Sequence, residues 1–412
     1  MNNIKKRVIT TTIACGVFIS IGGGLTASHN VYASEHGQWI YNNDYYEYDN
    51  GTKAKGWTEI DNKWYYFDKS NGYKKQNNFA TEIDKKYYYF NEDGVMQTGW
   101  KVHNGEWYYF DNDGIMALGF KKINGAWYYF MENSNYDYNN EYLNIGCMTT
   151  GLQKVNGEIY YLGNNGDMQT GWANTKGDWY YFNSNGTGVK GWKKINNIWY
   201  YFDKNDCKMK TGFNNIDGNT YYFDNNGAMA VNWVKVGGEW YHFENSGVMN
   251  TGWKKINNIW YYFDKNGAMA KGLNKIADKY YYFEDGGSAK LGWKNINGEW
   301  YYFKSDCSGA MKEWQNIGGY WYYFDSEAEM VTGSRTIGNE DYYFNDNGTM
   351  KTGWVKNNYC WYYYGSNGAK DYGWQKINGS WYYFGYDGEM ETGYVNIDGT
   401  YYQFGDNGVW QY

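Results

Sequence analysis

The stretch GWKKINNIWYYFDKNGAMAK at residues 252–271 decides the fold, because it recurs with substitutions along most of the chain. Taking Trp253 as the anchor, the equivalent position occurs 17 times, at residues 57, 79, 100, 120, 152, 172, 192, 213, 233, 253, 273, 293, 314, 334, 354, 374 and 394. The steps are 20 to 22 residues, except for one of 32 that contains a polar insertion at 131–146. A fixed short period of this kind is the signature of a repeat protein.

Each repeat is predicted to form a β-hairpin. Two short runs rich in aromatic and aliphatic residues flank a two-residue turn, Asn-Asn at 257–258. Asn-Asn or Asn-Gly favours a type I′ turn, because both central residues need positive φ. A two-residue turn fixes the register, and the predicted pairs are Ile256 with Ile259, Lys255 with Trp260, Lys254 with Tyr261, and Trp253 with Tyr262.

The register also assigns side chains to the two faces of the hairpin, since paired residues share a face. One face carries Trp253, Lys255, Trp260 and Tyr262, and the other carries Ile256, Ile259, Tyr261 and Phe263. The aliphatic face is expected to be the core, because Ile or Val follows the anchor by three residues in 13 of the 17 repeats. A single hairpin cannot bury that face, so the hairpins must stack. The prediction is an all-β solenoid of about 17 repeats.

Composition and charge exclude several functional classes. The 412 residues include 23 Trp, 51 Tyr, 19 Phe and 54 Gly but no Pro, which suits many short strands and turns and argues against both disorder and an aliphatic enzyme core. Residues 1–33 hold three of the 38 basic residues and none of the 45 acidic ones, so the rest of the chain has a net charge of about −10. Nucleic-acid binding is therefore not expected.

The amino-terminal segment 1–33 reads as a secretory signal peptide. A basic start at 5–7 precedes an apolar stretch at 8–25, and Val31-Tyr32-Ala33 resembles a cleavage site. A retained membrane span and a lipoprotein site at Cys15 are the alternatives. Residues 34–56 read as a degenerate first hairpin, and 57–412 as the repeat solenoid. No second apolar run of spanning length follows, so we expect a secreted protein with no membrane span after cleavage.

Cysteine and histidine are too sparse for a metal or redox site. The cysteines after residue 33 are Cys147, Cys207, Cys307 and Cys360, and none forms a C-x-x-C motif. We expect free cysteines, no metal and no cofactor. Carboxylate pairs such as Asp111 and Asp113 lie at turn positions of the repeats, and no non-repeat stretch is long enough for a catalytic domain. The protein is therefore predicted not to be an enzyme.

Two features are left once the core has been assigned: a pair of Trp residues and a Met shortly before the next anchor. The pair occupies the anchor and the position seven residues later in ten repeats, and a Met precedes twelve anchors. Two indoles on one face, closed by a ring and a thioether from the neighbouring repeat, would form a cage for a quaternary ammonium through cation–π attraction. The alternative is that these Trp residues only cover gaps between repeats.

The repeats without a Trp pair follow a rule. From residue 152 onward their anchors are Leu152, Phe213, Leu273, Ser334 and Tyr394, and these recur at every third repeat. Straight stacking would give no such pattern. A superhelix with three hairpins per turn would align them along one side, leaving two sides with Trp pairs.

These residues resemble the choline-binding, or cell-wall-binding, repeat family of Gram-positive surface proteins and phages. The motif G-W-x-x-x-N-G-x-W-Y-Y-F-x-x-x-G-x-M covers residues 56–412. The resemblance implies a left-handed β-solenoid of hairpins, three per turn, with choline sites between successive hairpins. It also implies choline-bearing teichoic or lipoteichoic acid as the partner and association with the cell wall.

Transferred to this sequence, each site takes a Trp pair from one repeat and a Tyr from the next repeat. The face assignment places this Tyr nine residues after the anchor of the next repeat, as Tyr282 stands after Leu273; only Tyr89 stands ten residues after its anchor. The predicted ligand-binding residues are Trp57, Trp64 and Tyr89; Trp100, Trp107 and Tyr129; Trp172, Trp179 and Tyr201; Trp192, Trp199 and Tyr222; Trp233, Trp240 and Tyr262; Trp253, Trp260 and Tyr282; Trp293, Trp300 and Tyr323; Trp314, Trp321 and Tyr343; Trp354, Trp361 and Tyr383; and Met269 and Met330. By the same rule Trp374 and Trp381 meet Gln403, which argues against a site there.

Two other functions remain open. Similar repeats occur in glucan-binding enzymes and clostridial toxins, which implies wall or host polysaccharide as an alternative ligand. A sugar site wants ring stacking with convergent amide or carboxylate partners, whereas the Met residues and full Trp pairs favour the ammonium cage. The third possibility is an adhesin or spacer whose repeats are scaffold and whose insertion at 131–146 contacts a partner.

Overall fold

The computed structural model describes residues 36–40, 44–75, 78–136 and 142–411, and the predicted signal peptide lies outside them. The described residues form strands, turns and bends but no helix, and so none that could span a membrane. They divide into two compact units, unit 1 (the described residues up to Gly191, with Phe202–Met209) and unit 2 (Trp192–Tyr201 and the described residues from Lys210 onward).

Consecutive strands pair as antiparallel hairpins in both units. The strands before the division are β1 (Gly37–Ile40), β2 (Tyr45–Tyr48), β3 (Gly56–Ile60), β4 (Lys63–Phe67), β5 (Asn78–Ile83), β6 (Lys86–Phe90), β7 (Gly99–His103), β8 (Glu106–Phe110), β9 (Gly119–Ile123), β10 (Ala126–Phe130), β11 (Asn135–Tyr136), β12 (Tyr142–Leu143), β13 (Gly151–Val155), β14 (Glu158–Leu162), β15 (Gly171–Thr175) and β16 (Asp178–Phe182). Two strands fall where the units divide, β17 (Gly191–Ile195) and β18 (Ile198–Phe202).

Unit 2 continues the same pattern and ends in a three-stranded sheet, β37–β38–β39. Its further strands are β19 (Gly212–Ile216), β20 (Asn219–Phe223), β21 (Asn232–Val236), β22 (Glu239–Phe243), β23 (Gly252–Ile256), β24 (Ile259–Phe263), β25 (Gly272–Ile276), β26 (Lys279–Phe283), β27 (Gly292–Ile296), β28 (Glu299–Phe303), β29 (Glu313–Ile317), β30 (Tyr320–Phe324), β31 (Gly333–Ile337), β32 (Glu340–Phe344), β33 (Gly353–Asn357), β34 (Cys360–Tyr364), β35 (Gly373–Ile377), β36 (Ser380–Phe384), β37 (Gly393–Ile397), β38 (Thr400–Phe404) and β39 (Trp410–Gln411).

The predicted turn and register are confirmed. Asn257 and Asn258 have φ of 49° and 65°, the left-handed pair that a type I′ turn requires. The observed pairs in β23–β24 are Trp253 with Tyr262, Lys254 with Tyr261, Lys255 with Trp260, and Ile256 with Ile259. The short side chain of Asn tolerates positive φ, so the sequence at the turn sets the alternation of faces along both strands.

The core differs in part from the predicted aliphatic face. Its continuous element is the large apolar residue that ends the return strand of each repeat, Leu162 in β14 and an aromatic residue such as the fully buried Phe263 in the others. The Ile three residues after the anchor is buried in some repeats, as at Ile60 and Ile216. Ile259, across the turn, is 44% exposed, so its assignment to the core was wrong. Next to the turn, the residue that ends the first strand is therefore better covered than its cross-strand partner in most repeats, as at Ile256 and Ile259.

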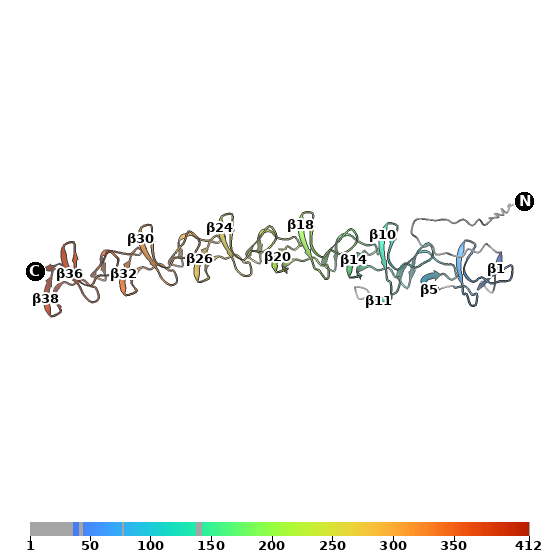
Figure 1. Cartoon of the computed structure of the whole chain (residues 1–412), viewed down its shortest axis with the longest axis horizontal. Helices are drawn as coiled ribbons and strands as arrows, with labels where there is room; N and C mark the ends of the chain where they lie inside the picture. The colour runs from blue at the N-terminus through green and yellow to red at the C-terminus, as the bar shows by residue number, and fades with distance from the viewer. Residues whose placement is uncertain (1–35, 41–43, 76–77, 137–141, 412) are drawn as a thin grey trace, which may run out of the picture. The chain divides into compact units, whose positions relative to one another are not determined.

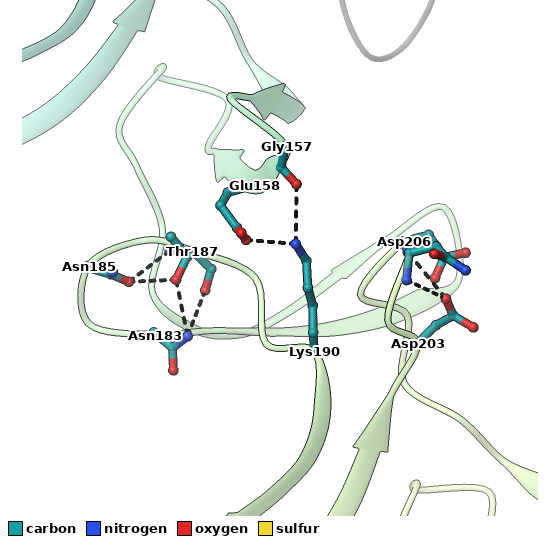
Figure 2. Close-up of polar contacts among 9 residues, drawn as sticks. Gly157, Glu158, Asn183, Asn185, Thr187, Lys190, Asp203 and Asp206 are labelled. Carbon is teal, nitrogen blue, oxygen red and sulfur yellow. Dashed lines mark hydrogen bonds and ion pairs between the residues drawn. The ribbon is translucent and has the colours of Figure 1, made fainter. Parts of the chain in front are cut away.

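The linkers between hairpins are held by short side chains. Asp264 accepts hydrogen bonds from the backbone N–H groups of Asn266 (2.8 Å) and Ala268 (2.9 Å). In unit 1, the Asn185 side chain accepts from the N–H and the hydroxyl of Thr187, as Figure 2 shows. These local bonds satisfy the backbone where no strand partner exists, as is typical of Asp- and Asn-rich turns.

Within unit 2 the hairpins repeat their direction at every third position. Figure 1 shows β24, β30 and β36 projecting to one side, and β26, β32 and β38 to the other. Successive members of each set are three hairpins apart, so the hairpins form a solenoid with three hairpins per turn. The left-handed sense of the coil stays a prediction.

Candidate functional site

An aromatic cavity lies between successive hairpins of unit 2. Its lining residues are Trp233, Trp240, Tyr261, Met269 and Gly286, and its volume is about 400 Å³. The two indoles stand nearly perpendicular, at 85°, with their centroids 6.4 Å apart. The Tyr261 ring packs on Trp233 at 4.9 Å. Three consecutive repeats therefore contribute to one site.

Hairpin register places the two indoles together. Trp233 pairs with His242 and Lys235 pairs with Trp240, so Trp233 and Trp240 lie on the same face of β21–β22. Tyr261 comes from the opposite face of the next hairpin, where it pairs with Lys254. Because side chains alternate between the two faces of a hairpin, the same hairpin presents its Trp pair toward the next hairpin and a Tyr toward the preceding one.

The two indoles of a pair differ in their surroundings. The inner one, such as Trp253, is partly buried and also packs on Phe283 of the next hairpin at 5.6 Å. The outer one lies seven residues later and is more open, with exposed fractions between 37% and 48% at Trp107, Trp179, Trp199, Trp240, Trp260, Trp300, Trp321, Trp361 and Trp381. The inner Trp therefore also closes the gap between repeats, while each of these nine outer indoles leaves more than a third of its surface exposed.

The pairwise arrangement recurs in both units. Centroid separations of 6.1 to 6.4 Å and angles of 81° to 89° are found in nine pairs, whose inner members are Trp100, Trp172, Trp192, Trp233, Trp253, Trp293, Trp314, Trp354 and Trp374. In the tenth pair, Trp57 and Trp64 occupy the equivalent positions of β3 and β4. Identical geometry in each repeat follows from the identical register.

The ring that comes from the next hairpin is not the one predicted. It is the Tyr one residue earlier: Tyr88 on Trp57, Tyr128 on Trp100, Tyr221 on Trp192, Tyr261 on Trp233, Tyr281 on Trp253, Tyr322 on Trp293, Tyr342 on Trp314 and Tyr382 on Trp354, at 4.6 to 5.0 Å. The same rule puts Tyr402 on Trp374 at 4.9 Å, so Gln403 does not remove that site.

The predicted Tyr residues instead face the anchor of their own hairpin, which the register makes their cross-strand partner. Contacts of this kind join Tyr89 to Phe79, Tyr129 to Phe120, Tyr201 to Trp192, Tyr222 to Phe213, Tyr262 to Trp253, Tyr323 to Trp314 and Tyr383 to Trp374. Tyr282 and Tyr343 pair with Leu273 and Ser334 in the same way. Placing all cage rings on one face of each hairpin was the error, because the preceding hairpin lies against the opposite face.

A methionine from the linker after the second hairpin closes the cage. Its backbone N–H donates to the carbonyl of the outer Trp, as Met269 does to Trp240 at 2.9 Å. The backbone N–H of Met330, the other methionine predicted to bind a ligand, donates to the Trp300 carbonyl in the same way. The equivalent residue is Met96, Met148, Met209, Met229, Met350 and Met390 in other repeats.

Two cages depart from this pattern. Ala289 takes the methionine position behind Trp260, to whose carbonyl it donates at 2.9 Å, so the cage of Trp253 lacks a thioether. At the carboxyl-terminal cage, Trp410 takes that position and lies 5.7 Å from Trp374. Sequence reasoning missed Trp410, although it stands 36 residues after its anchor, as Met269 does after Trp233.

In most cages the methionine lies against a glycine of the following linker. A Cβ at Gly287 would stand 2.2 Å from Met269 Sδ, so no side chain fits there. Where the methionine position holds a small residue, the glycine position holds a larger one: Gly188 with Cys207, Ala289 with Cys307, and Ala310 with Ala328. The two positions share one space, and this accounts for Cys207 and Cys307, two of the four cysteines among the described residues, all four of which are free thiols.

At one of the repeats without a Trp pair, the chain itself fills the space. At Leu152, the buried Ile159 and Cys207 pack into one apolar cluster. Lys190 lies over its rim, donating to the Gly157 carbonyl at 3.2 Å and pairing with Glu158 at 2.9 Å, as Figure 2 shows.

In the repeat of the Ser334 anchor, Asp341 occupies the position of the outer Trp. Its environment predicts how the stability of the fold depends on pH. Hydrogen bonds from Thr336 (2.6 Å) and Tyr372 (2.7 Å), with Lys370 nearby, lower the pKa of Asp341 from 3.8 to about 2. A depressed pKa stabilises the fold above the unfolded value and loses that effect as the carboxylate is protonated. The stability advantage of wild type over Asp341→Asn should be full at pH 6 and decline from about pH 4 to pH 2, measured by thermal denaturation; a pH-independent difference would contradict this.

Comparison with known proteins matches the repeats along the chain. The choline-binding repeat model matches residues 80–118, 149–186, 170–211, 210–251, 250–292 and 331–370, together more than half of the chain. A cell wall binding repeat model matches residues 55–74, 119–134, 292–306, 312–327 and 373–390. No curated protein matches the chain.

Several solved structures are similar to this chain. CbpJ from Streptococcus pneumoniae TIGR4 is 28% identical over 62% of this chain and 100% of its own, with a TM-score of 0.49. Choline binding protein F from Streptococcus pneumoniae is 29% identical over 63% and 100%, with a TM-score of 0.48. A pneumococcal cell wall endolysin from phage Cp-1, complexed with choline, is 32% identical over 32% of this chain and 40% of its own, with a TM-score of 0.24.

Proposed function

The chain belongs to the choline-binding repeat family, and from that premise we propose that it is a secreted, non-catalytic wall-binding protein whose cages hold the choline groups of teichoic or lipoteichoic acids. The observation that carries the proposal is the cage of two indoles, a phenol ring and a thioether around an open cavity. A trimethylammonium group donates no N–H hydrogen bond, so the faces of aromatic rings suit it better than isolated hydrogen-bonding groups.

The binding free energy of one cage is small, so tight attachment requires many cages. A cation–π contact contributes on the order of 0.5 to 2 kcal/mol, and three rings at one site therefore give weak binding by themselves. The ten Trp pairs repeat along the chain, and a wall polymer presents choline repeatedly. Linked weak sites on a repetitive polymer gain from effective concentration.

The test is a titration of tryptophan fluorescence in the purified protein with choline chloride, with ethanolamine at the same ionic strength as the control. We expect a saturable change in the millimolar range with choline only. Trp361→Ala should remove part of the amplitude, because this indole lines the cage of Trp354 and is 41% exposed. Tyr386→Ala is the matched variant, since its ring is 99% exposed outside that cavity's lining. The same flat response to both compounds would contradict the proposal.

One observation favours carbohydrate as a second candidate ligand. The cavity at Trp354, of about 380 Å³, is lined by Asp406 and Asn407 in addition to Trp361, Tyr382 and Met390. A carboxylate and an amide beside stacked rings are the polar partners that a sugar needs. If choline fails, saturable binding of a glycan that is lost in Asn407→Ala would support this second function.

A further inference from the structure

Two lysines stand where the cage methionines stand. In the repeat before that of Met390, the equivalent position holds Lys370. Lys370 forms a β-bridge with Tyr364, as Met390 does with Phe384. Its backbone N–H donates to the Asp341 carbonyl at 2.8 Å. In unit 1, Lys74 forms a β-bridge with Phe67, and its backbone N–H donates to the Asp44 carbonyl at 2.9 Å. At both lysines the backbone therefore follows the path that it takes at a cage methionine, and the lysine side chain takes the place of the thioether.

The ammonium of Lys370 lies inside the set of groups that surround a cage. Its Nζ is 3.1 Å from Asp341 Oδ2, where Asp341 replaces the outer Trp, and it donates to the Asp387 carbonyl at 3.0 Å. The Nζ lies 5.5 Å from the ring centroid of Tyr362, the residue at the third-ring position, and 5.2 Å from that of Tyr372. The side chain is only 14% exposed, and Gly388 leaves the room it needs.

Lys74 repeats this placement independently. Its Nζ lies 5.0 Å from the ring centroid of Trp39, on which Tyr65 packs at 5.0 Å. It donates to the Asp93 carbonyl at 3.0 Å, and a Cβ at Gly94 would meet its Cδ at 2.9 Å. In both cages the ammonium thus binds the carbonyl of the Asp that precedes the linker glycine and faces an aromatic ring. Two occurrences of one arrangement argue against a chance rotamer.

We propose that Lys74 and Lys370 are built-in ligands, each placing its own ammonium where the open cages hold the ammonium of a bound ligand. The chain then carries two classes of cage: open cages and cages closed by their own cation. A fixed ammonium repels a second cation and fills the space beside the rings, so the closed cages take no choline. This inference rests on the proposed function for the identity of the ligand, whereas the closure of the two cages rests on the contacts alone.

The first experiment measures the accessibility of each lysine without any ligand. The purified protein is treated with formaldehyde and a borohydride reductant, and methylation at each lysine is followed by peptide mass spectrometry. We expect Lys370 and Lys74 to react about tenfold more slowly than the exposed Lys265 and Lys63, because reaction requires local opening of the cage. Equal rates would overturn the proposal, and this readout does not depend on whether the protein binds choline.

The second experiment restores the missing group chemically. Lys370→Ala removes a propylammonium arm and leaves Asp341, Tyr362 and Tyr372 in place, so n-propylammonium chloride should raise the thermal unfolding temperature of this variant by more than that of wild type. Lys265→Ala is the matched variant and should respond as wild type does, and n-propanol should have no selective effect. An equal rise in all three proteins would overturn the proposal. A selective rise together with no choline response in wild type would support the closed cage and contradict the proposed function.

Discussion

Replacing Gly287 by alanine should destabilise unit 2 by about 1 to 3 kcal/mol, since the new methyl group would strain a backbone at φ 78° and overlap Met269. Replacing Met269 by alanine should cost about 2 to 5 kcal/mol, because that side chain is almost fully buried. The double variant copies the pair that the chain has at Ala310 and Ala328. It should be more stable than the sum of the two single effects by about 1 kcal/mol or more, measured by the midpoints of urea denaturation.

The control for this cycle separates strain from overlap. Gly292 has φ 75°, close to that of Gly287, but a Cβ there would meet no atom within 4 Å. Gly292→Ala should therefore show the cost of positive φ alone and no coupling to Met269→Ala. Strict additivity of Gly287→Ala and Met269→Ala would mean that the methionine and the glycine do not share one space.

Local chemistry explains how much of the hairpin was predictable. Two consecutive Asn residues at 257–258 allow one turn type, and that turn allows one register, so the pairing of Trp253 with Tyr262 followed from the sequence. The three-repeat period of the Trp-poor anchors predicted the direction of successive hairpins, because a change of side chain at every third repeat needs a geometric cause. Both predictions depend on residues close in sequence or on a strict period.

The third ring was missed because it depends on how one hairpin lies against the next. Tyr281 and Tyr282 are adjacent, chemically identical, and point to opposite faces, so composition cannot choose between them. Only the stacked arrangement shows that the face with Tyr281 turns toward Trp253. The same limit applies to Lys370, whose sequence neighbours do not reveal the distant Tyr362 and Asp341 that surround it.

Removing the seven outer indoles of unit 2 together should weaken binding to choline-bearing cell walls by 10²-fold or more, although each single removal should change it only slightly. The variant carries alanine at Trp199, Trp240, Trp260, Trp300, Trp321, Trp361 and Trp381. Polymer binding depends on the number of cages that are engaged at once, so the loss grows faster than the number of cages removed. Sedimentation of the protein with purified walls measures the affinity, and excess free choline should release wild type.

The same variants distinguish multivalent binding from damage to the fold. These indoles are 37% to 47% exposed, so circular dichroism should report the wild-type content of hairpins in the seven-site variant. Equilibrium dialysis should find fewer bound choline molecules per chain but an unchanged dissociation constant at each remaining cage. A wall affinity that falls only in proportion to the number of cages lost would mean that the cages act one at a time. Repetition would then supply capacity without tightening attachment, and the family's long arrays would need a different physical explanation.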